Sequence, residues 1–288
     1  MEVKVCNTAG FCFGVKRAVD SVYETMKSEG TVYTYGPVVH NKSVVKELED
    51  KGVVTLNSYE ELNELCHDEK RKKDAIVVIR AHGVPKSVYT LMEESGIRYT
   101  DATCPFVKRI HEIVSGVEKT KLTAIVGDPE HPEVVGIKGW VSGECIVIND
   151  SDGLEELSLP KDREIVVVSQ TTYNYNKFQD IVEKIKKKGY NVNVVNTICN
   201  ATETRQRQSE DLAREADVMI VIGGKHSSNT AKLYEICSKE CEKTYYIETL
   251  DDLHLELPKA VRLVGITAGA STPNKLIEEV QNYVRINF

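Results

Sequence analysis

The segment CFGVKRAV at residues 12–19 recurs in altered form as CPFVKRIH at 104–111 and as CNATETRQ at 199–206. In each copy a cysteine opens a stretch that reads as a helix. The three cysteines lie 92 and 95 residues apart, and this repeat length suits a small α/β unit. The 288 residues are therefore predicted to form three similar units.

Two further landmarks follow each cysteine at nearly constant distance. A first apolar strand ends in a glycine, and a polar residue stands 27 or 28 positions after the cysteine: His40, His131 and Ser227. A second apolar strand ends in another polar residue 67 to 72 positions after the cysteine: His82, Thr171 and Ser271. Polar groups at the carboxyl ends of parallel strands face a ligand crevice. The three sets can meet only if the units surround one centre, so we expect a pseudo-threefold arrangement.

Short Val/Ile-rich runs alternate with longer amphipathic segments along the whole chain. Strands are predicted at 31–35, 75–80, 123–127, 145–148, 165–169, 218–223 and 262–267. Helices are predicted at about 14–28, 42–50, 85–95, 106–119, 175–188, 202–216, 229–239 and 273–285. Apolar strands separated by helices are typical of parallel sheets covered on both faces. The predicted fold class is α/β, with three small parallel-sheet domains at 1–97, 98–194 and 195–288.

Charge and hydropathy exclude several classes of protein. The chain has 37 Lys and Arg against 44 Asp and Glu, a formal net charge of −7, and only 7% aromatic residues. This balance argues against a nucleic-acid binder that relies on bulk positive charge. We therefore expect no nucleic-acid partner. No apolar run approaches the roughly 18 residues of a membrane span, so no membrane segment is expected either. We expect a cytoplasmic protein.

Eight cysteines are more than such a protein needs for packing. Cys12, Cys104 and Cys199 are too far apart for a local zinc finger, but they suit a metal centre held between domains. Each stands at a predicted helix N-terminus, where the helix dipole favours the thiolate. Three thiolates leave one position open on a tetrahedral zinc or on one iron of a [4Fe–4S] cluster.

The other five cysteines do not recur at this spacing of 92 to 95 residues. Cys6, Cys66 and Cys145 are interpreted as structural. Cys237 and Cys241 lie one helical turn apart and could form a redox pair, but their charged neighbours favour an ordinary helix surface.

Hydroxyl, amide and imidazole groups gather at the predicted strand ends. Together they resemble a neutral cage of hydrogen-bond donors, and several precede helices whose N-termini bind phosphate. Each could instead satisfy nearby backbone groups as a loop or N-cap residue. The candidate anion ligands are His40, His82, His131, Thr171, Ser227, Ser228, Asn229 and Ser271.

Glu133 is the candidate proton donor, because it stands two residues after His131 at the end of a strand. A solvated loop glutamate is its ordinary alternative. Two other functions also fit these features. One is a zinc-dependent hydrolase of a phosphorylated small molecule, and the other is a redox-sensing module without turnover.

Nine segments together resemble the 4-hydroxy-3-methylbut-2-enyl diphosphate reductase family of the non-mevalonate isoprenoid pathway, and the resemblance covers essentially the whole chain. They are GFCFGVKRAV (10–19), GPVVHN (36–41), RAHGV (80–84), DATCPFV (101–107), GDPEHPEVVG (127–136), SQTT (169–172), NTICNAT (196–202), SSNT (227–230) and TAGAST (267–272).

The resemblance implies a three-domain trefoil with a [4Fe–4S] cluster on Cys12, Cys104 and Cys199. It also implies an iron–sulfur oxidoreductase that removes the hydroxyl of an allylic diphosphate, using two electrons and two protons, to give isopentenyl and dimethylallyl diphosphates. A donor such as ferredoxin or flavodoxin would supply the electrons. Glu133, Thr171 and His131 are the implied catalytic residues. The implied diphosphate ligands are His40, His82, His131, Ser227, Ser228, Asn229 and Ser271, and Thr171 is implied to contact the hydroxyl end of the substrate.

Overall fold

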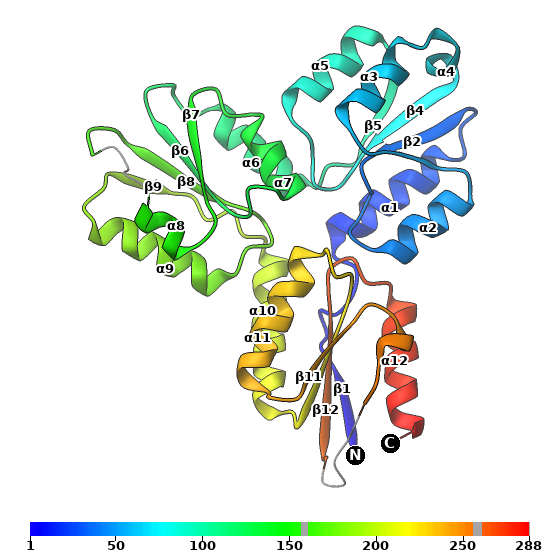
Figure 1. The fold of residues 1–288 in the computed structure, drawn as a ribbon, viewed down its shortest axis with the longest axis vertical. Helices are drawn as coiled ribbons and strands as arrows, with labels where there is room; N and C mark the ends of the chain where they lie inside the picture. The colour runs from blue at the N-terminus through cyan, green and yellow to red at the C-terminus, as the bar shows by residue number, and fades with distance from the viewer. Residues whose placement is uncertain (157–160, 256–260, 288) are drawn as a thin grey trace. The chain divides into compact units, whose positions relative to one another are not determined.

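The computed structural model describes residues 1–156, 161–255 and 261–287. Their strands form three four-stranded sheets, and every strand pair is parallel (Figure 1). All residues of β4, β6, β8, β10 and β12 are buried, because both faces of these strands are covered. The predicted fold class, three similar parallel-sheet α/β domains, is confirmed.

The first sheet has the strand order β3-β2-β4-β5. Its strands are β2 (Thr31–Tyr35), β3 (Val54–Leu56), β4 (Ala75–Ile79) and β5 (Arg98–Asp101). Four helices lie between these strands in the chain: α2 (Lys42–Asp50), α3 (Tyr59–His67), α4 (Glu69–Asp74) and α5 (Lys86–Ser95). Leu62 and Leu65 of α3 and Met92 of α5 pack with β4 in one apolar cluster.

The second sheet has the order β7-β6-β8-β9. Its strands are β6 (Leu122–Val126), β7 (Glu144–Ile148), β8 (Ile165–Ser169) and β9 (Val192–Val194). The helices are α6 (Pro105–Ser115), α7 (Pro132–Lys138), α8 (Ser151–Glu156) and α9 (Tyr175–Lys187). Phe178 and Ile181 of α9 pack on one face of the sheet, and Ile110 of α6 and Ile137 of α7 pack on the other.

The third sheet has the order β1-β12-β10-β11. Its strands are β1 (Glu2–Val5), β10 (Val218–Ile222), β11 (Thr244–Ile247) and β12 (Leu263–Ala268). The associated helices are α10 (Asn200–Glu215), α11 (Ser228–Glu240), the 3₁₀ turn η1 (Leu250–Asp252) and α12 (Asn274–Asn287). Val280 of α12 packs on one face, and Leu233 of α11 packs on the other.

The three sheets share one topology. In each, the first strand of the repeat (β2, β6 or β10) and the third (β4, β8 or β12) are central, and the second (β3, β7 or β11) is one edge. The other edge strand is β5, β9 or β1, and each of these leads into Cys104, Cys199 or Cys12. The repeat predicted from the cysteines is therefore present in the sheets.

The sheets group the chain differently from the predicted ranges 1–97, 98–194 and 195–288. The N-terminal strand β1 pairs with β12 and completes the third sheet, and β5 at 98–101 pairs with β4 in the first. A cysteine thus follows the last edge strand of its sheet and does not open a new domain. The predicted boundaries followed the spacing of the three cysteines, and this spacing does not indicate with which sheet a short edge strand pairs.

By backbone proximity the chain divides into two compact units. One comprises 1–16, 39–46 and 200–288, and the other comprises 17–38 and 47–199. The helices α1 (Phe13–Thr25) and α2 (Lys42–Asp50) run from one unit into the other. In the described ranges, no helix has the length and apolar character needed to cross a membrane.

All seven predicted strands and all eight predicted helices are present within a few residues. Within the described residues the structure adds five strands, each of three or four residues: β1, β3, β5, β9 and β11. It also adds four helices of six to nine residues: α3, α4, α7 and α8. These elements are edge strands and short helices, in which few positions carry the hydrophobic period.

Candidate active site

The predicted polar residues follow the two central strands of each sheet. His40 follows β2 and His82 follows β4; His131 follows β6 and Thr171 follows β8. Ser227 follows β10, and Ser271 follows β12. Since parallel strands end at one edge, this topology brings His131 and Thr171 to one edge of the second sheet, and Ser227 and Ser271 to one edge of the third.

In the second sheet, Glu133 and Thr171 form a buried pair. Thr171 donates its backbone N–H to Glu133 Oε1 at 2.6 Å and its hydroxyl to Oε2 at 2.7 Å. The glutamate is only 2% exposed, so the solvated-loop alternative for this residue is wrong. Burial raises the pKa of Glu133 from 4.5 to about 7, although the two hydrogen bonds from Thr171 lower it. The carboxyl group can therefore gain or lose a proton near neutral pH.

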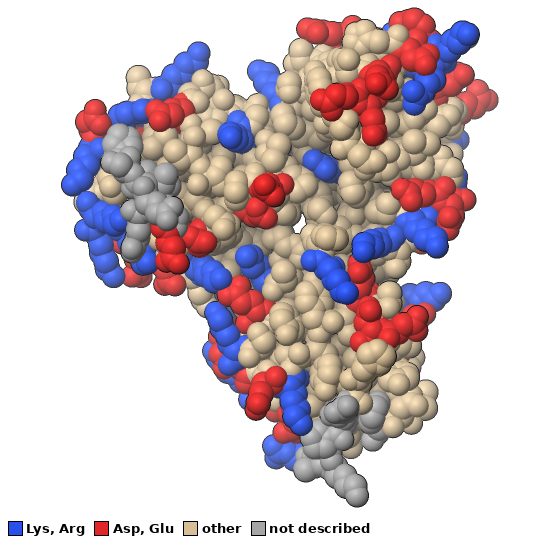
Figure 2. Space-filling model, viewed as in Figure 1, with Lys and Arg blue, Asp and Glu red and all other residues tan. Residues whose placement is uncertain are grey.

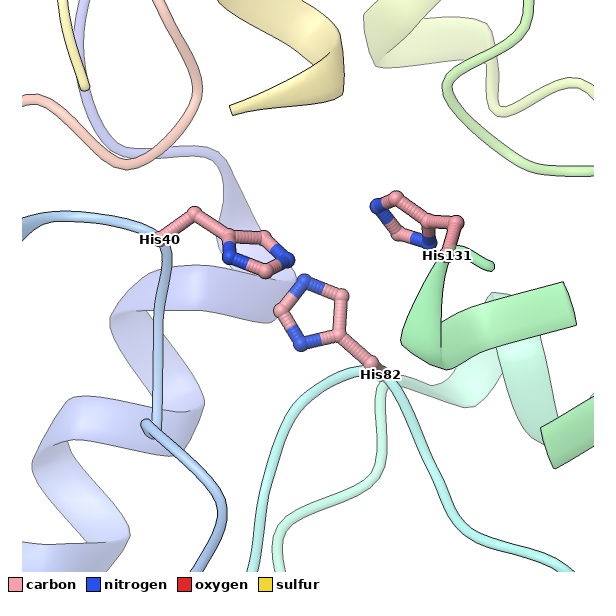
Figure 3. A group of neighbouring side chains, drawn as sticks. All are labelled: His40, His82 and His131. Atoms are coloured by element: carbon pink, nitrogen blue, oxygen red, sulfur yellow. The ribbon is translucent and has the colours of Figure 1, made fainter. Parts of the chain in front are cut away.

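His131 caps the helix that carries Glu133. Its Nδ1 accepts the backbone N–H of Glu133 at 3.1 Å, so in the neutral ring Nε2 carries the hydrogen. The rings of His131 and His82 meet edge to face, with centroids 5.5 Å apart (Figure 3). Both histidines belong to the unit that contains residues 47–199, and their imidazoles lie together at the start of the helix that carries Glu133.

In the third sheet, the loops after β10 and β12 are joined by Asn229. Its side-chain oxygen accepts the backbone N–H of Ala270 at 3.0 Å. The Asn229 amide nitrogen is buried and has no hydrogen-bond partner among the described residues. Ser227 caps α11 by accepting the N–H of Thr230, and Ser228 is the first helical residue. This edge thus presents a helix N-terminus together with an unused amide donor.

Ser271 and His40 lie in the same unit as Asn229. Ser271 donates its hydroxyl to the backbone oxygen of His40 at 3.1 Å. Gly224 also approaches this oxygen, because a Cβ on Gly224 would stand 2.6 Å from it. The loop that carries His40, which Figure 3 also labels, is therefore held against the loops of the third sheet.

The three repeat cysteines share one backbone contact. Cys12 N–H bonds to the carbonyl of Ala270, Cys104 N–H to that of Ala81, and Cys199 N–H to that of Thr171, at 3.1, 2.9 and 3.0 Å. Each acceptor is the polar residue after the third strand of the repeat, or its immediate neighbour: Ser271, His82 or Thr171. In every sheet a cysteine is thus bonded to the loop that carries a candidate substrate ligand.

These three thiols are half-buried, and each stands at the start of a helix. The backbone N–H of Val15 in α1 points to Cys12 Sγ at 3.5 Å. By contrast, Cys6, Cys66, Cys237 and Cys241 are buried, and Cys237 and Cys241 are not on the exposed helix surface that was expected. Burial raises the pKa of Cys6, Cys145, Cys237 and Cys241, to about 12 for Cys237, which disfavours thiolates there.

A protein-family model described as LytB protein matches residues 3–285. The chain belongs to the LytB protein family. Among LytB relatives, the 4-hydroxy-3-methylbut-2-enyl diphosphate reductase of Caldanaerobacter subterraneus is 44% identical over 283 residues, covering 97% of this chain and 95% of that protein. The protein of the same name from Clostridioides difficile is 41% identical over 286 residues, covering 99% of both.

Two solved structures also resemble this LytB family member. One is described as (E)-4-hydroxy-3-methyl-but-2-enyl diphosphate reductase, the terminal enzyme of the non-mevalonate pathway; it has 39% identity and a TM-score of 0.69, with 98% of both chains covered. The other is a diphosphate reductase from Plasmodium falciparum with 26% identity and a TM-score of 0.89, covering 99% of this chain and 88% of that one.

The sequence analysis did not single out three residues whose side chains bond to the backbone of loops at this LytB site. Gln170 accepts the backbone N–H of Asp128 at 3.2 Å and so joins the loops after β6 and β8. Arg17 and Arg205 bond to backbone carbonyls near two of the cysteines. The only available signal was an arginine five or six residues after a cysteine, and by itself that spacing points to no contact.

Proposed function

We propose that the chain is a 4-hydroxy-3-methylbut-2-enyl diphosphate reductase. The reaction takes the allylic alcohol diphosphate, two electrons and two protons, and it yields water with isopentenyl or dimethylallyl diphosphate. Relatives that carry this name align over nearly the full chain at 40–44% identity. The observation that carries the proposal is the buried Glu133–Thr171 pair, whose acid titrates near neutrality beside the loop tied to Cys199.

Membership of the LytB family implies an iron–sulfur cluster, and the donor set fits one. Cys12, Cys104 and Cys199 are half-buried thiols at helix starts, where a thiolate is favoured. We assign them as the three ligands of a [4Fe–4S] cluster. When bound, such a cluster supplies electrons one at a time and offers an iron without a protein ligand as a Lewis acid for the substrate hydroxyl.

The diphosphate is assigned to neutral donors. Ser227, Ser228 and Asn229 surround the start of α11, where free backbone N–H groups favour an anion. His40, His82, His131 and Ser271 complete the proposed set. Acidic and basic side chains are interspersed over the face in Figure 2, as expected for a protein that does not attract its substrate by bulk charge.

Glu133 is assigned as the proton donor to the departing hydroxyl. Its protonated form is accessible at pH 7, and its burial keeps bulk water away from the carboxyl group. Thr171 fixes both carboxyl oxygens and presents its own hydroxyl as the relay. His131 orients the backbone of Glu133 through Nδ1 and keeps an N–H on Nε2.

The decisive experiment is anaerobic purification followed by iron and sulfide analysis and an assay with a chemically reduced dye. The proposal expects brown protein with about four irons and four sulfides per chain, and both isoprenoid diphosphates as products. A reduced small redox protein such as ferredoxin or flavodoxin should replace the dye.

Cys12→Ser should assemble far less cluster than wild type, whereas Cys145→Ser, on the edge strand β7, should assemble a normal amount. Colourless zinc-containing protein would favour the hydrolase. An intact cluster without product formation would favour the redox-sensing module.

A further inference from the structure

A buried arginine binds the segment that leads into Cys12. Arg205 of α10 is 3% exposed, and it donates Nη2 to the carbonyl of Gly10 and Nη1 to that of Ala268, both at 2.8 Å. Gly10 stands two residues before Cys12, and Ala268 ends β12 three residues before Ser271. One guanidinium therefore holds the backbone beside a proposed cluster ligand and beside a proposed substrate ligand.

A second arginine makes the equivalent contact at Cys104. Arg17 of α1 donates Nη1 to the carbonyl of Thr103 at 2.8 Å and Nη2 to that of Asp101 at 3.4 Å. Thr103 directly precedes Cys104, and Asp101 ends the edge strand β5. As with Arg205, the arginine lies on a helix that begins after a different cysteine.

The segment before Cys199 is held in another way. Thr197 donates its hydroxyl to the carbonyl of Ser169 at 2.6 Å and accepts the N–H of Ser169 at 2.7 Å. Arg109 follows Cys104 by five residues, as Arg17 follows Cys12, but it is exposed, and its side chain makes no hydrogen bond or ion pair with any described residue. The contact is therefore specific to Arg17 and Arg205 and does not come from their place in the repeat.

Arginine suits this task because its planar guanidinium holds two acceptors at a fixed angle and stays charged. Hydrogen bonds from a charged donor are shorter and stronger than neutral ones. Removing Arg205 would leave two buried carbonyls without these bonds and free the loop of Gly10 to move relative to β12.

We propose that Arg205 and Arg17 are positioning residues that fix the backbone next to Cys12 and Cys104, so that these thiols stay placed to ligate the cluster. This inference rests on the proposed function, because it concerns the same cluster. Loss of either arginine should make the cluster labile while leaving its three ligands in the sequence.

The test compares Arg205→Met and Arg17→Met with two matched controls. Arg207→Met changes an exposed arginine of the same helix α10, and Arg109→Met changes the exposed counterpart of Arg17. After anaerobic purification, iron and sulfide content, the rate at which a chelator bleaches the visible absorption, and the paramagnetic resonance spectrum of the reduced cluster are measured. Bleaching should be roughly 10- to 100-fold faster in the two test variants, with an altered spectrum, and unchanged in both controls.

General loss of stability is separated from positioning by two more variants. Val280→Ala truncates a fully buried core residue of α12 and lowers Tm without touching either arginine. At equal loss of Tm it should bleach at the wild-type rate. Arg205→Lys keeps the charge but lacks the planar guanidinium that holds two acceptors at a fixed angle. Its bleaching rate should therefore lie between those of wild type and Arg205→Met.

Three results would overturn the inference. The first is a wild-type bleaching rate in both Arg205→Met and Arg17→Met. The second is bleaching of Val280→Ala as fast as that of the two arginine variants, and the third is wild-type protein that holds no cluster at all. The last result would also overturn the proposed function, whereas the first two would leave that function standing. If Arg205→Met does not fold, Arg205→Lys and the partly exposed Arg17→Met still decide the outcome.

Discussion

In the second sheet the loops after the two central strands meet through a carboxyl group, and in the third sheet the equivalent loops meet through an amide. Glu133 is the second residue of α7 and Asn229 is the second residue of α11. Each accepts the backbone N–H of the residue two positions beyond the neighbouring strand, Thr171 after β8 and Ala270 after β12. The residues that cap the two helices, His131 and Ser227, also correspond.

This comparison separates structure from chemistry. The bond that joins the loops is the same in both sheets, so it does not require a carboxyl group. What differs is the second atom of each side chain. Glu133 keeps an oxygen that titrates near pH 7, whereas Asn229 keeps a buried N–H₂ donor that cannot titrate. The second sheet therefore suits proton transfer, and the third suits binding of an anion.

Replacing Glu133 with Gln makes the second sheet resemble the third. The Gln oxygen can still accept the N–H of Thr171, but the side chain no longer supplies a proton. Turnover should fall by about 10² to 10⁴-fold, the range that a general acid contributes. The cluster content and the KM should stay close to wild type, and steady-state assays with iron analysis measure all three.

Glu130→Gln is the matched control, since Glu130 is exposed and lies three residues earlier, in the loop before α7. It should keep wild-type turnover. Near-normal turnover in Glu133→Gln would refute the proton role of this residue.

Replacing Asn229 with Asp makes the third sheet resemble the second. The new side chain keeps an acceptor for the N–H of Ala270, but it puts a negative charge where the diphosphate is proposed to bind. KM should rise about 10- to 100-fold, because a donor to a charged group is lost and repulsion is added. Turnover at saturating substrate should change much less.

Asn229→Ala provides the comparison, since it removes both the donor and the acceptor for the N–H of Ala270 without adding charge, and its KM should rise less than that of Asn229→Asp. An unchanged KM in Asn229→Asp would remove Asn229 from the diphosphate site.

The pH dependence of kcat/KM tests the difference between the titrating carboxyl group of the second sheet and the amide of the third. A general acid works only while it holds its proton, and the pKa of Glu133 is raised to about 7. In wild-type protein, kcat/KM should therefore be level below pH 7 and fall about tenfold per pH unit above it. The residual activity of Glu133→Gln should lack this bend. The same bend in both proteins would assign it to another group.

The main architecture could be predicted from the sequence because central parallel strands are apolar on both faces and helices carry a clear period. The spacing of Cys12, Cys104 and Cys199 also predicted the repeat. The pairing of β1 with β12 could not be predicted, because a four-residue edge strand has few apolar positions and its partner lies at the other end of the chain.

The candidate site was predictable to the level of residue types at strand ends. Glu133 was expected as a carboxyl near His131, but its burial and its two bonds to Thr171 follow from the packing of α7 against β8. The burial of Arg205 could not be predicted from its place six residues after Cys199, since a charged residue in a polar helix is usually solvated. Its burial depends on carbonyls almost 200 and about 60 residues away in the chain.

The close approach of the loops in the third sheet depends on Gly223, and this gives the smallest expected effect. Gly223 has φ +154°, and a Cβ there would overlap the Thr230 hydroxyl and stand 3.0 Å from that of Thr272. Gly223→Ala should lower the free energy of unfolding by about 3 kcal/mol, from backbone strain and overpacking together. Because Thr230 follows Asn229, a few-fold rise in KM should accompany this loss.

Gly189 provides the control for backbone strain alone. It has φ +77°, and a Cβ there would meet nothing within 4 Å. Gly189→Ala should lower the free energy of unfolding by about 1 kcal/mol and leave KM unchanged. Denaturant titration and steady-state kinetics of both variants measure these differences. An equal loss in the free energy of unfolding in the two variants would mean that the loops of the third sheet can move apart at little cost. The placement of the Asn229 amide would then not depend on their close contact.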